Sequence, residues 1–380
     1  MLVTCTTCIL DTHDDPNLKF NENGVCNYCL NYQNKYVNEL PSFEFRSQQL
    51  KGLLQKIKQN GVGKKYDSIM GLSGGVDSSY LAYLAKQWGL NPLLIHFDNG
   101  WNSELAVKNI DSIVSHTGFD LYTYVVDWEE FKDLQLSYIK ASVLDWEIPT
   151  DHGFFAMLYK QASKHNIKYI LTGHNFQTEA ILPKTMRWSK MDVANIIDIH
   201  RKHGTKKLKT FPMMGFFEYS NYQLVKKIER LNLLEYVEYD KNQAKEVIKK
   251  EFAWRDYGGK HYESIFTRFY QGYVLKEKFG FDKRKAHLSN LICSGQIMRN
   301  EAINEIQKNP YSSELQLEED KEFVLKKLGL TEEKFNELMK RPVKSHLEYN
   351  SYETGLYPKH AKFMKAISGM TKLIKKLKSS

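Results

Sequence analysis

The chain has 380 residues, of which 42% are hydrophobic and 26% are charged, an ordinary balance for a globular protein with room for two or three domains. The formal net charge is +9, but residues 359–380 contain seven lysines and no acidic residue, which leaves only about +2 on the rest of the chain. Such a weak basic balance argues against a nucleic-acid partner. No apolar run could span a membrane and the first residues lack a secretion signal, so we expect a cytoplasmic protein with reduced cysteines.

Two cysteine pairs stand at the start of the chain. Cys5 and Cys8 are separated from Cys26 and Cys29 by 17 residues, a spacing typical of a Cys₄ zinc ribbon. Four thiolates close a tetrahedral shell and leave no position for a substrate, so we predict a structural Zn²⁺. An iron–sulfur cluster is the main alternative for the same ligands.

Residues 1–60 are predicted to form this zinc module and a helical connector, and residues 61–220 an α/β core. The predicted strands of the core are 66–70, 93–97, 121–126 and 168–172, and the predicted helices are 79–88, 105–114 and 154–164. This alternation predicts a doubly wound parallel sheet with ligands at the carboxyl ends of the strands. We expect a helical ligand-binding region over 221–310. Residues 311–380 are predicted to be helical too, ending in a basic amphipathic tail that docks on its own domain or, less favourably, contacts a membrane surface.

The segment 71–79, with the sequence GLSGGVDSS, joins the first predicted strand to a helix. The first N–H groups of a helix lack internal partners and attract anions, and Gly74 and Gly75 let the backbone approach a phosphate closely. We therefore predict a pyrophosphate-binding loop in which Asp77 binds Mg²⁺. The residues that we expect to contact phosphate are Ser73, Gly74, Gly75, Ser78 and Ser79. The alternative is a turn that merely caps a helix.

This loop resembles that of the PP-loop ATP pyrophosphatases, which have an adenine nucleotide alpha hydrolase-like fold. The resemblance implies that ATP is cleaved between its α and β phosphates, so that AMP activates a substrate oxygen for replacement. Asp98, after the second strand, is then expected to bind the ribose or the adenine amino group. Gly173 and His174, after the fourth strand, are expected to face the phosphates, although a lone histidine is often structural. Glu179 is a candidate second Mg²⁺ ligand or a helix cap.

Two later segments carry candidate substrate contacts. Residues 254–263, with the sequence WRDYGGKHYE, combine aromatic rings with fixed cations, which suits a sugar that carries an acidic group. We expect Arg255, Tyr257, Lys260 and His261 to bind this substrate. By similarity to asparagine-synthetase-like enzymes, Lys283 or Arg284 reaches the pyrophosphate, the alternative being the solvated start of a helix.

Over roughly residues 1–310 the chain resembles the bacterial N-acetyl sugar amidotransferases of the pseudaminic acid and O-antigen pathways. The motifs that carry the resemblance are the Cys₄ ribbon, SGGVDSS, TGHN, WRDYGGKHYES and DKRKAHLSNLICSGQ. The resemblance implies that ATP and ammonia convert an acetamido group of a lipopolysaccharide or flagellin sugar into an acetamidino group. Asp77, His174, Lys283 and Arg284 would be the catalytic residues.

The chain carries no glutaminase signature of its own. Position 2 is leucine, and Cys293 is the only cysteine outside the two pairs. The resemblance accordingly implies separate glutaminase and ammonia-channel subunits, similar to the imidazole glycerol phosphate synthase pair. A tRNA-modifying PP-loop sulfurtransferase is the alternative function, and an ATP-binding scaffold module is a third.

Overall fold

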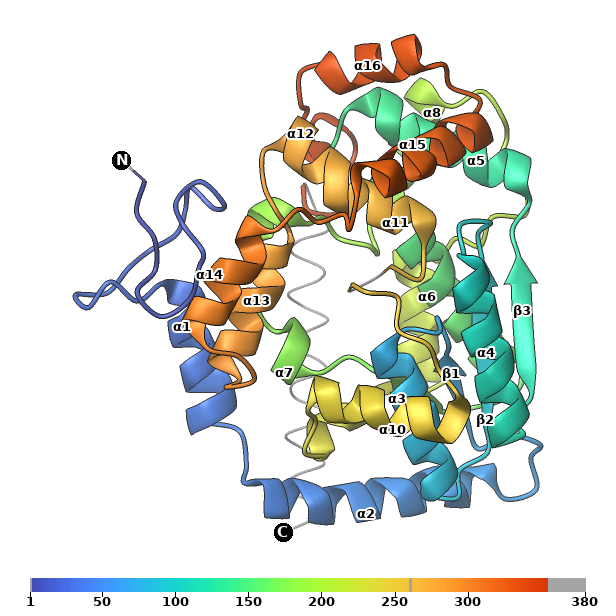
Figure 1. The fold of residues 1–380 in the computed structure, drawn as a ribbon. Helices are drawn as coiled ribbons and strands as arrows, with labels where there is room; N and C mark the ends of the chain where they lie inside the picture. Colours follow the sequence, from blue (N-terminus) through green and yellow to red (C-terminus); the bar gives the residue numbers. More distant parts are fainter. Residues whose placement is uncertain (1, 260–261, 355–380) are drawn as a thin grey trace.

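A computed structural model describes residues 2–259 and 262–354 (Figure 1). Lys260, His261 and the basic tail lie outside the described residues. The strands are β1 (Ser68–Gly71), β2 (Pro92–Asp98), β3 (Leu121–Val125), β4 (Tyr169–Thr172) and β5 (Glu229–Asn232). They form one parallel sheet in the order β3-β2-β1-β4-β5, which confirms the predicted α/β class. The strand order reverses between β1 and β4, the place where doubly wound sheets bind ligands.

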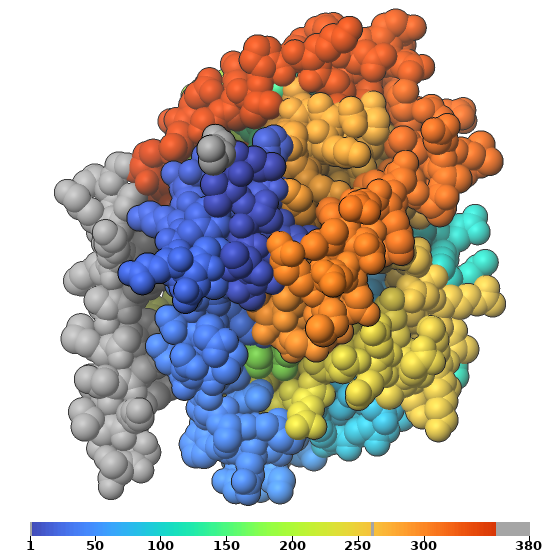
Figure 2. All heavy atoms as spheres, turned by 60° about the vertical axis from the view of Figure 1, so that its left-hand side comes forward, coloured from blue at the N-terminus to red at the C-terminus, as the bar shows by residue number. Residues whose placement is uncertain are grey.

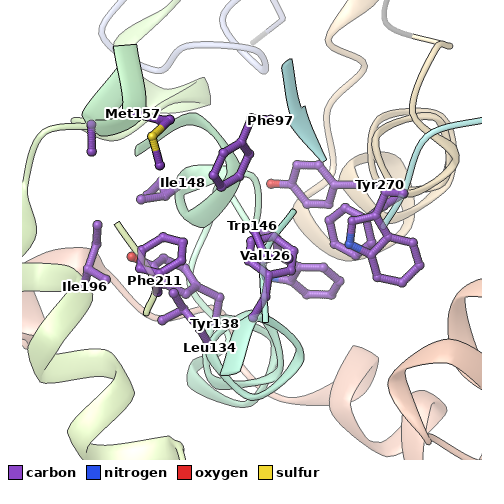
Figure 3. Packing of buried hydrophobic residues seen from close by; sticks show 14 of the residues in the cluster. Phe97, Val126, Leu134, Tyr138, Trp146, Ile148, Met157, Ile196, Phe211 and Tyr270 are labelled. Atoms are coloured by element: carbon purple, nitrogen blue, oxygen red, sulfur yellow. The ribbon is translucent and has the colours of Figure 1, made fainter. Parts of the chain in front are cut away.

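Helices cover both faces of the sheet. One face carries α3 (Val76–Gln87), α4 (Glu104–Thr117) and α10 (Lys241–Phe252), and the other carries α5 (Trp128–Ala141), α6 (Ile148–Lys164) and α8 (Val193–His203). Successive residues of a strand point to opposite faces, so Ile69 packs in the core with α6 while Met70 packs in the core with α3. Figure 3 shows the core on the α6 side, where Trp146 and Ile148 lie among residues of α5 and α8.

The connector that follows the cysteine module and the described part of the C-terminal region are helical, as predicted. The N-terminal elements are α1 (Asn27–Tyr32), η1 (Gln33–Asn38) and the connector α2 (Phe43–Gly61). The later helices are α11 (Ile265–Phe269), α12 (Leu275–Phe279), α13 (Arg284–Cys293), α14 (Arg299–Gln307), α15 (Glu314–Leu328) and α16 (Glu332–Lys340). The shorter elements are α7 (Phe176–Glu179), η2 (Lys184–Met186), α9 (Phe216–Ser220), η3 (Asn221–Val225), η4 (Leu233–Tyr236), η5 (Tyr270–Val274) and η6 (His346–Glu348).

Packing is continuous across the predicted domain boundaries. Phe269 from α11 and Phe335 from α16 belong to the same buried cluster as Ile69 and Ile95 of the sheet. This shared core does not mark domain boundaries at residues 220 and 310, so those boundaries stay predictions. Within the described part of the chain, no helix is both long and apolar enough to cross a membrane.

Candidate active site

The loop that follows β1 takes a shape that only glycine fits at one position. Gly74 has φ +80°, and a Cβ placed on it would lie 3.0 Å from the Tyr257 hydroxyl and 3.2 Å from the carbonyl oxygen of Ala106. Both the backbone conformation and the surrounding space thus exclude a side chain there. The predicted strand–loop–helix arrangement is confirmed, since β1 ends at Gly71 and α3 begins at Val76.

Two aromatic residues hold this loop from behind. The Trp254 indole donates a hydrogen bond of 2.8 Å to the carbonyl oxygen of Gly74, and the Tyr257 hydroxyl donates one of 2.9 Å to the same oxygen. Because the C=O and N–H of one trans peptide point in opposite directions, the N–H of Gly75 faces the other side of the loop. It donates to the Ser73 hydroxyl there, at 3.2 Å. The aromatic pair therefore fixes this peptide with its N–H on the side of the loop where the Ser73 hydroxyl lies.

Arg255, next to Trp254 in the chain, packs its backbone against α4. Arg255 is exposed, and its backbone N–H and C=O each pair with the Asn109 side chain at 2.9 Å. Four residues were predicted to bind the sugar substrate, and one of them, Tyr257, contacts the loop over residues 71–79, which we call the nucleotide loop. Binding of the sugar by Arg255, Lys260 and His261 stays a prediction.

The serines of the loop divide into two kinds. The Ser73 and Ser78 hydroxyls lie 3.2 Å apart at the accessible mouth of the loop. Ser79 is fully buried and donates to the carbonyl oxygen of Gly75 at 2.7 Å. Ser73 and Ser78 are accordingly placed to meet a phosphate, whereas a contact from Ser79 would require its bond to Gly75 to break.

Asp77 lies in the first turn of α3, close to the end of β4. A Cβ on Gly173 would be 2.9 Å from the carbonyl carbon of Asp77, so these two backbones touch. The Tyr239 hydroxyl donates a short hydrogen bond to the Asp77 carboxylate. Burial raises the pKa of Tyr239 well above its usual value, and the negative charges of Asp77 and Glu179 raise it further. This fixes Tyr239 as a donor between the two carboxylates.

His174 and Glu179 form a pair at the same edge. Nδ1 of His174 lies 2.7 Å from Oε2 of Glu179. The structure therefore brings Asp77, Gly173, His174 and Glu179 together, as the sequence predicted. The Asp77 and Glu179 carboxylates are hard oxygen donors of the kind that Mg²⁺ prefers, and they are the residues that would hold it.

Asp98 is the last residue of β2 and belongs to a hydrogen-bond network that was not predicted from the sequence. Its carboxylate accepts the N–H of Gly100 at 2.9 Å. His96 donates from Nδ1 to the carbonyl oxygen of Leu72 at 3.0 Å, so its Nε2 accepts from Asn102 at 3.0 Å. The strand that carries Asp98 is thereby linked to the start of the nucleotide loop.

Lys283 and Arg284 have different surroundings. Nζ of Lys283 lies 3.5 Å from Oε2 of Glu147 at the start of α6. The Arg284 guanidinium pairs with Asp282 at 2.6 Å and donates to the carbonyl oxygen of Lys308 at 3.0 Å. A pyrophosphate contact from Arg284 would require these bonds to be exchanged. The roles of Lys283 and Arg284 stay predictions.

The four N-terminal cysteines converge in a buried cluster. Their sulfurs lie 3.9 Å apart for Cys5 and Cys29, 3.8 Å for Cys8 and Cys26, and 3.6 Å for Cys26 and Cys29. In a tetrahedral site with Zn–S bonds of about 2.3 Å, the sulfurs are about 3.8 Å apart. The donor set and its spacing therefore fit a single tetrahedral metal ion. Cys293 lies outside this set, with its sulfur 3.5 Å from that of Cys29.

The cysteine module supports the active-site edge through α7. Phe176 of α7 packs in the same buried cluster as the four cysteines. The Asn290 side chain of α13 bonds to the N–H of Ile181 at 2.7 Å and to the carbonyl oxygen of Gln177 at 2.6 Å. Figure 2 shows the N-terminal module packed directly against α13 and α14. The segment that carries His174 and Glu179 is therefore held from outside the sheet.

Comparisons with known proteins give one family match and several curated relatives. Residues 263–366 match the family described as "LPS biosynthesis protein WbpG-like, C-terminal domain". The chain is 27% identical over 174 residues to the uncharacterized protein MJ1599 of Methanocaldococcus jannaschii, covering 45% of this chain and 58% of that protein. It is 30% identical over 131 residues to tRNA(Ile)-lysidine synthase of Chlamydia pneumoniae, covering 33% and 37%. The chain therefore spans well under two thirds of the length of these curated relatives.

Solved structures give more distant similarities. One is the NH3-dependent NAD synthetase of Campylobacter jejuni, with 14% identity, coverage of 40% of this chain and 64% of that one, and a TM-score of 0.29. Another is the U34-tRNA thiolase NcsA of Methanococcus maripaludis, with 13% identity, coverage of 66% and 84%, and a TM-score of 0.27. The family match therefore shows a WbpG-like C-terminal domain over residues 263–366.

Proposed function

We propose that this protein is an ATP-dependent amidotransferase that converts the acetamido group of a bacterial surface-glycan sugar into an acetamidino group. The observation that carries the proposal is the glycine loop between β1 and α3, which has the Ser73 and Ser78 hydroxyls on its accessible side and Asp77 in the following turn against Gly173. The lipopolysaccharide description of the matched domain supports a sugar acceptor. The resemblance to N-acetyl sugar amidotransferases supports the reaction.

The site can perform this reaction by positioning and charge stabilisation. An amide oxygen is a poor leaving group, but it departs readily once AMP is attached, and ammonia can then attack the carbon. The N–H groups of the loop and the Ser73 and Ser78 hydroxyls would bind the phosphates and stabilise charge on the departing pyrophosphate. Mg²⁺, held by Asp77 and Glu179, would supply further charge neutralisation. His174, paired with Glu179, would face the phosphates from the end of β4.

We further propose that ammonia comes from partner subunits, a glutaminase and an ammonia channel similar to the imidazole glycerol phosphate synthase pair. Cys293 is the one thiol outside the four-cysteine set, and its sulfur lies against that of Cys29. A glutaminase nucleophile needs a partner base and free access to substrate, which this packing does not favour.

For the four-cysteine cluster we propose a structural Zn²⁺. Its sulfur spacing supports a single ion, because the thiolates of an iron–sulfur cluster bind different irons and are held further apart. Metal analysis of the purified protein tests this directly. One zinc per chain is expected, and iron with acid-labile sulfide would contradict it.

A tRNA-modifying enzyme remains the second candidate, because the curated relatives include a tRNA(Ile)-lysidine synthase and a tRNA-specific 2-thiouridylase. Each match covers only 37% or 35% of the relative. The experiment that separates the two functions supplies ATP, Mg²⁺ and ammonium with either an N-acetylated sugar or unmodified tRNA. Formation of AMP that depends on the sugar supports our proposal, and formation that depends on tRNA supports the alternative.

A further inference from the structure

The N-terminal end of α6 carries charged residues at the ligand edge of the sheet. α6 runs opposite to the strands, because His165 at its end packs on Tyr66 before β1, whereas Phe154 lies on Gly71 at the end of β1. Asp151 is one turn closer to the start of the helix than Phe154 and on the same side. It therefore lies beyond the end of β1, toward the side where the nucleotide loop begins.

Four other charged residues are linked to Asp151 directly or through a shared neighbour. Lys190 is central, with its Nζ 2.6 Å from Asp145 and 3.0 Å from Asp151. Lys283 approaches Glu147 at 3.5 Å, and Gln271 donates to Glu147 at 2.8 Å. We call Asp145, Glu147, Asp151, Lys190 and Lys283 the α6 cluster. It contains three carboxylates and two ammonium groups.

Only some residues of the α6 cluster are needed to stabilise the fold. Asp145 is the anchor: its side chain is 6% exposed, its backbone has φ +66°, and it accepts the N–H of Trp188 at 3.2 Å as well as Lys190. Non-glycine residues seldom adopt this conformation, and they concentrate at functional sites. Asp151, in contrast, is 44% exposed on its side chain. The Asp145–Lys190 ion pair is enough to hold the 184–191 segment against the start of α6, so this contact does not require Asp151.

Lys190 is also fixed from the opposite side. The buried ring of His152 donates from Nδ1 to the carbonyl oxygen of Lys190 at 2.8 Å and accepts at Nε2 from the N–H of Met214 at 3.0 Å. Lys190, which pairs with Asp151, is therefore held in a fixed position, while the Asp151 carboxylate stays accessible to solvent.

These observations, together with the proposed function on which this inference rests, lead to a role for the α6 cluster. We propose that it is the place where the acceptor amide meets ammonia, and that Asp151 accepts the proton that the attacking nitrogen loses. The cluster has one carboxylate more than it has lysines, so it suits an acceptor group that is neutral at first and becomes a cation. An amidine product is such a cation at neutral pH.

The step balances as follows. The adenylated imidate keeps the hydrogen of the amide on its nitrogen and is therefore cationic. The lone pair of ammonia forms a C–N bond to its carbon. The C–O bond to AMP then breaks, and AMP leaves with the electron pair. One proton passes from the new nitrogen to the Asp151 carboxylate and from there to solvent. The product keeps one positive charge, opposite the remaining carboxylates of the cluster.

The test compares two partial reactions in the Asp151→Asn variant of the full-length protein. With ATP, Mg²⁺ and the N-acetylated sugar but no ammonium, we expect a first-turnover release of pyrophosphate like that of the unmodified protein. With ammonium added, amidine formation should fall about 100-fold, the usual effect of removing a general base. Hydroxylamine forms a more acidic adduct that loses its proton to water, so it should restore most of the rate. Glu104→Gln, which removes an exposed acid from the first turn of α4 at the same edge, is the matched control and should behave normally.

Other results would overturn the inference. Normal amidine formation by Asp151→Asn would show that Asp151 is not the base. Loss of pyrophosphate release together with amidine formation would assign Asp151 to acceptor binding or to structure instead. If the unmodified protein releases no pyrophosphate with N-acetylated sugars, the proposed function itself fails and this inference with it.

Discussion

Gly173 directly follows β4, with its backbone against the first turn of α3. A methyl group there would lie 2.9 Å from the carbonyl carbon of Asp77, and backbone atoms cannot move aside as a flexible side chain can. We expect Gly173→Ala to displace Asp77 and lower kcat/KM about 100-fold, as misplacement of catalytic groups by about 1 Å does. Steady-state kinetics and the melting temperature check this together. Gly52→Ala is the control, because a Cβ on Gly52 meets nothing within 4 Å.

His152 gives the protein a pH-dependent stability. Burial lowers the pKa of His152 to about 4, whereas histidine in an unfolded chain titrates near pH 6.5. Between these values the unfolded chain binds a proton that the folded protein does not, so stability falls as the pH drops through this window. From pH 7.5 to 5.5 the free energy of unfolding should fall by about 1.4 kcal/mol from this residue.

Urea unfolding of the protein and of His152→Gln at both pH values measures that contribution. Glutamine can keep both hydrogen bonds but does not titrate, so the variant should show a smaller pH dependence by this amount. If the variant does not fold, NMR titration of His152 in the unmodified protein decides the point. A ring that protonates near pH 6.5 would contradict the expectation.

At the scale of secondary-structure elements, α7 connects the cysteine module to the active-site edge. We expect Cys26→Ser to lose the zinc, lower the melting temperature and slow turnover, because Phe176 of α7 packs in the cluster with the cysteines. Zinc analysis, thermal unfolding and hydrogen exchange over residues 173–182 measure the three effects. Cys293→Ser, which removes a sulfur outside the tetrahedron, should keep its zinc. A Cys26→Ser protein with one zinc per chain and normal melting would refute the assignment.

The elements predicted from sequence are those whose pattern is local. The strands of the sheet centre are continuously apolar, as in β2, where the first six residues are buried. β5 was missed because Glu229 and Arg230 are exposed at the sheet edge and its only partner strand, β4, is distant in sequence. α5 was also missed. Asp127 caps this helix by accepting the N–H of Glu130 at 3.0 Å, and an aspartate before a helix is a capping signal that can be recognised in the sequence.

The same distinction applies to the site. The residues of the loop lie within a short segment, as do His174 and Glu179, so the sequence alone named them as candidates, although it did not predict that His174 and Glu179 pair. The α6 cluster was not, because its members come from three separate segments: 145–151, Lys190 and Lys283. Trp254 and Tyr257 were expected in a sugar pocket, and only the fold places their donors on Gly74.

At the scale of the whole molecule, the source of ammonia is the property that depends on other proteins. We expect the purified protein to use ammonium but not glutamine, and to use glutamine when glutaminase and channel subunits are added. Amidine formation with each nitrogen source measures this. Glutamine hydrolysis by the protein alone, lost in Cys293→Ser, would contradict it.

The central claim is that the protein transfers AMP from ATP to an amide oxygen and replaces that oxygen with nitrogen. Mass spectrometry and phosphate analysis of a reaction with ATP, Mg²⁺, ammonium and an N-acetylated sugar test it most directly. We predict equal amounts of AMP, pyrophosphate and a sugar in which NH has replaced the amide oxygen, all abolished in Asp77→Asn. Formation of ADP and phosphate, or of AMP in the absence of any acceptor, would contradict the claim.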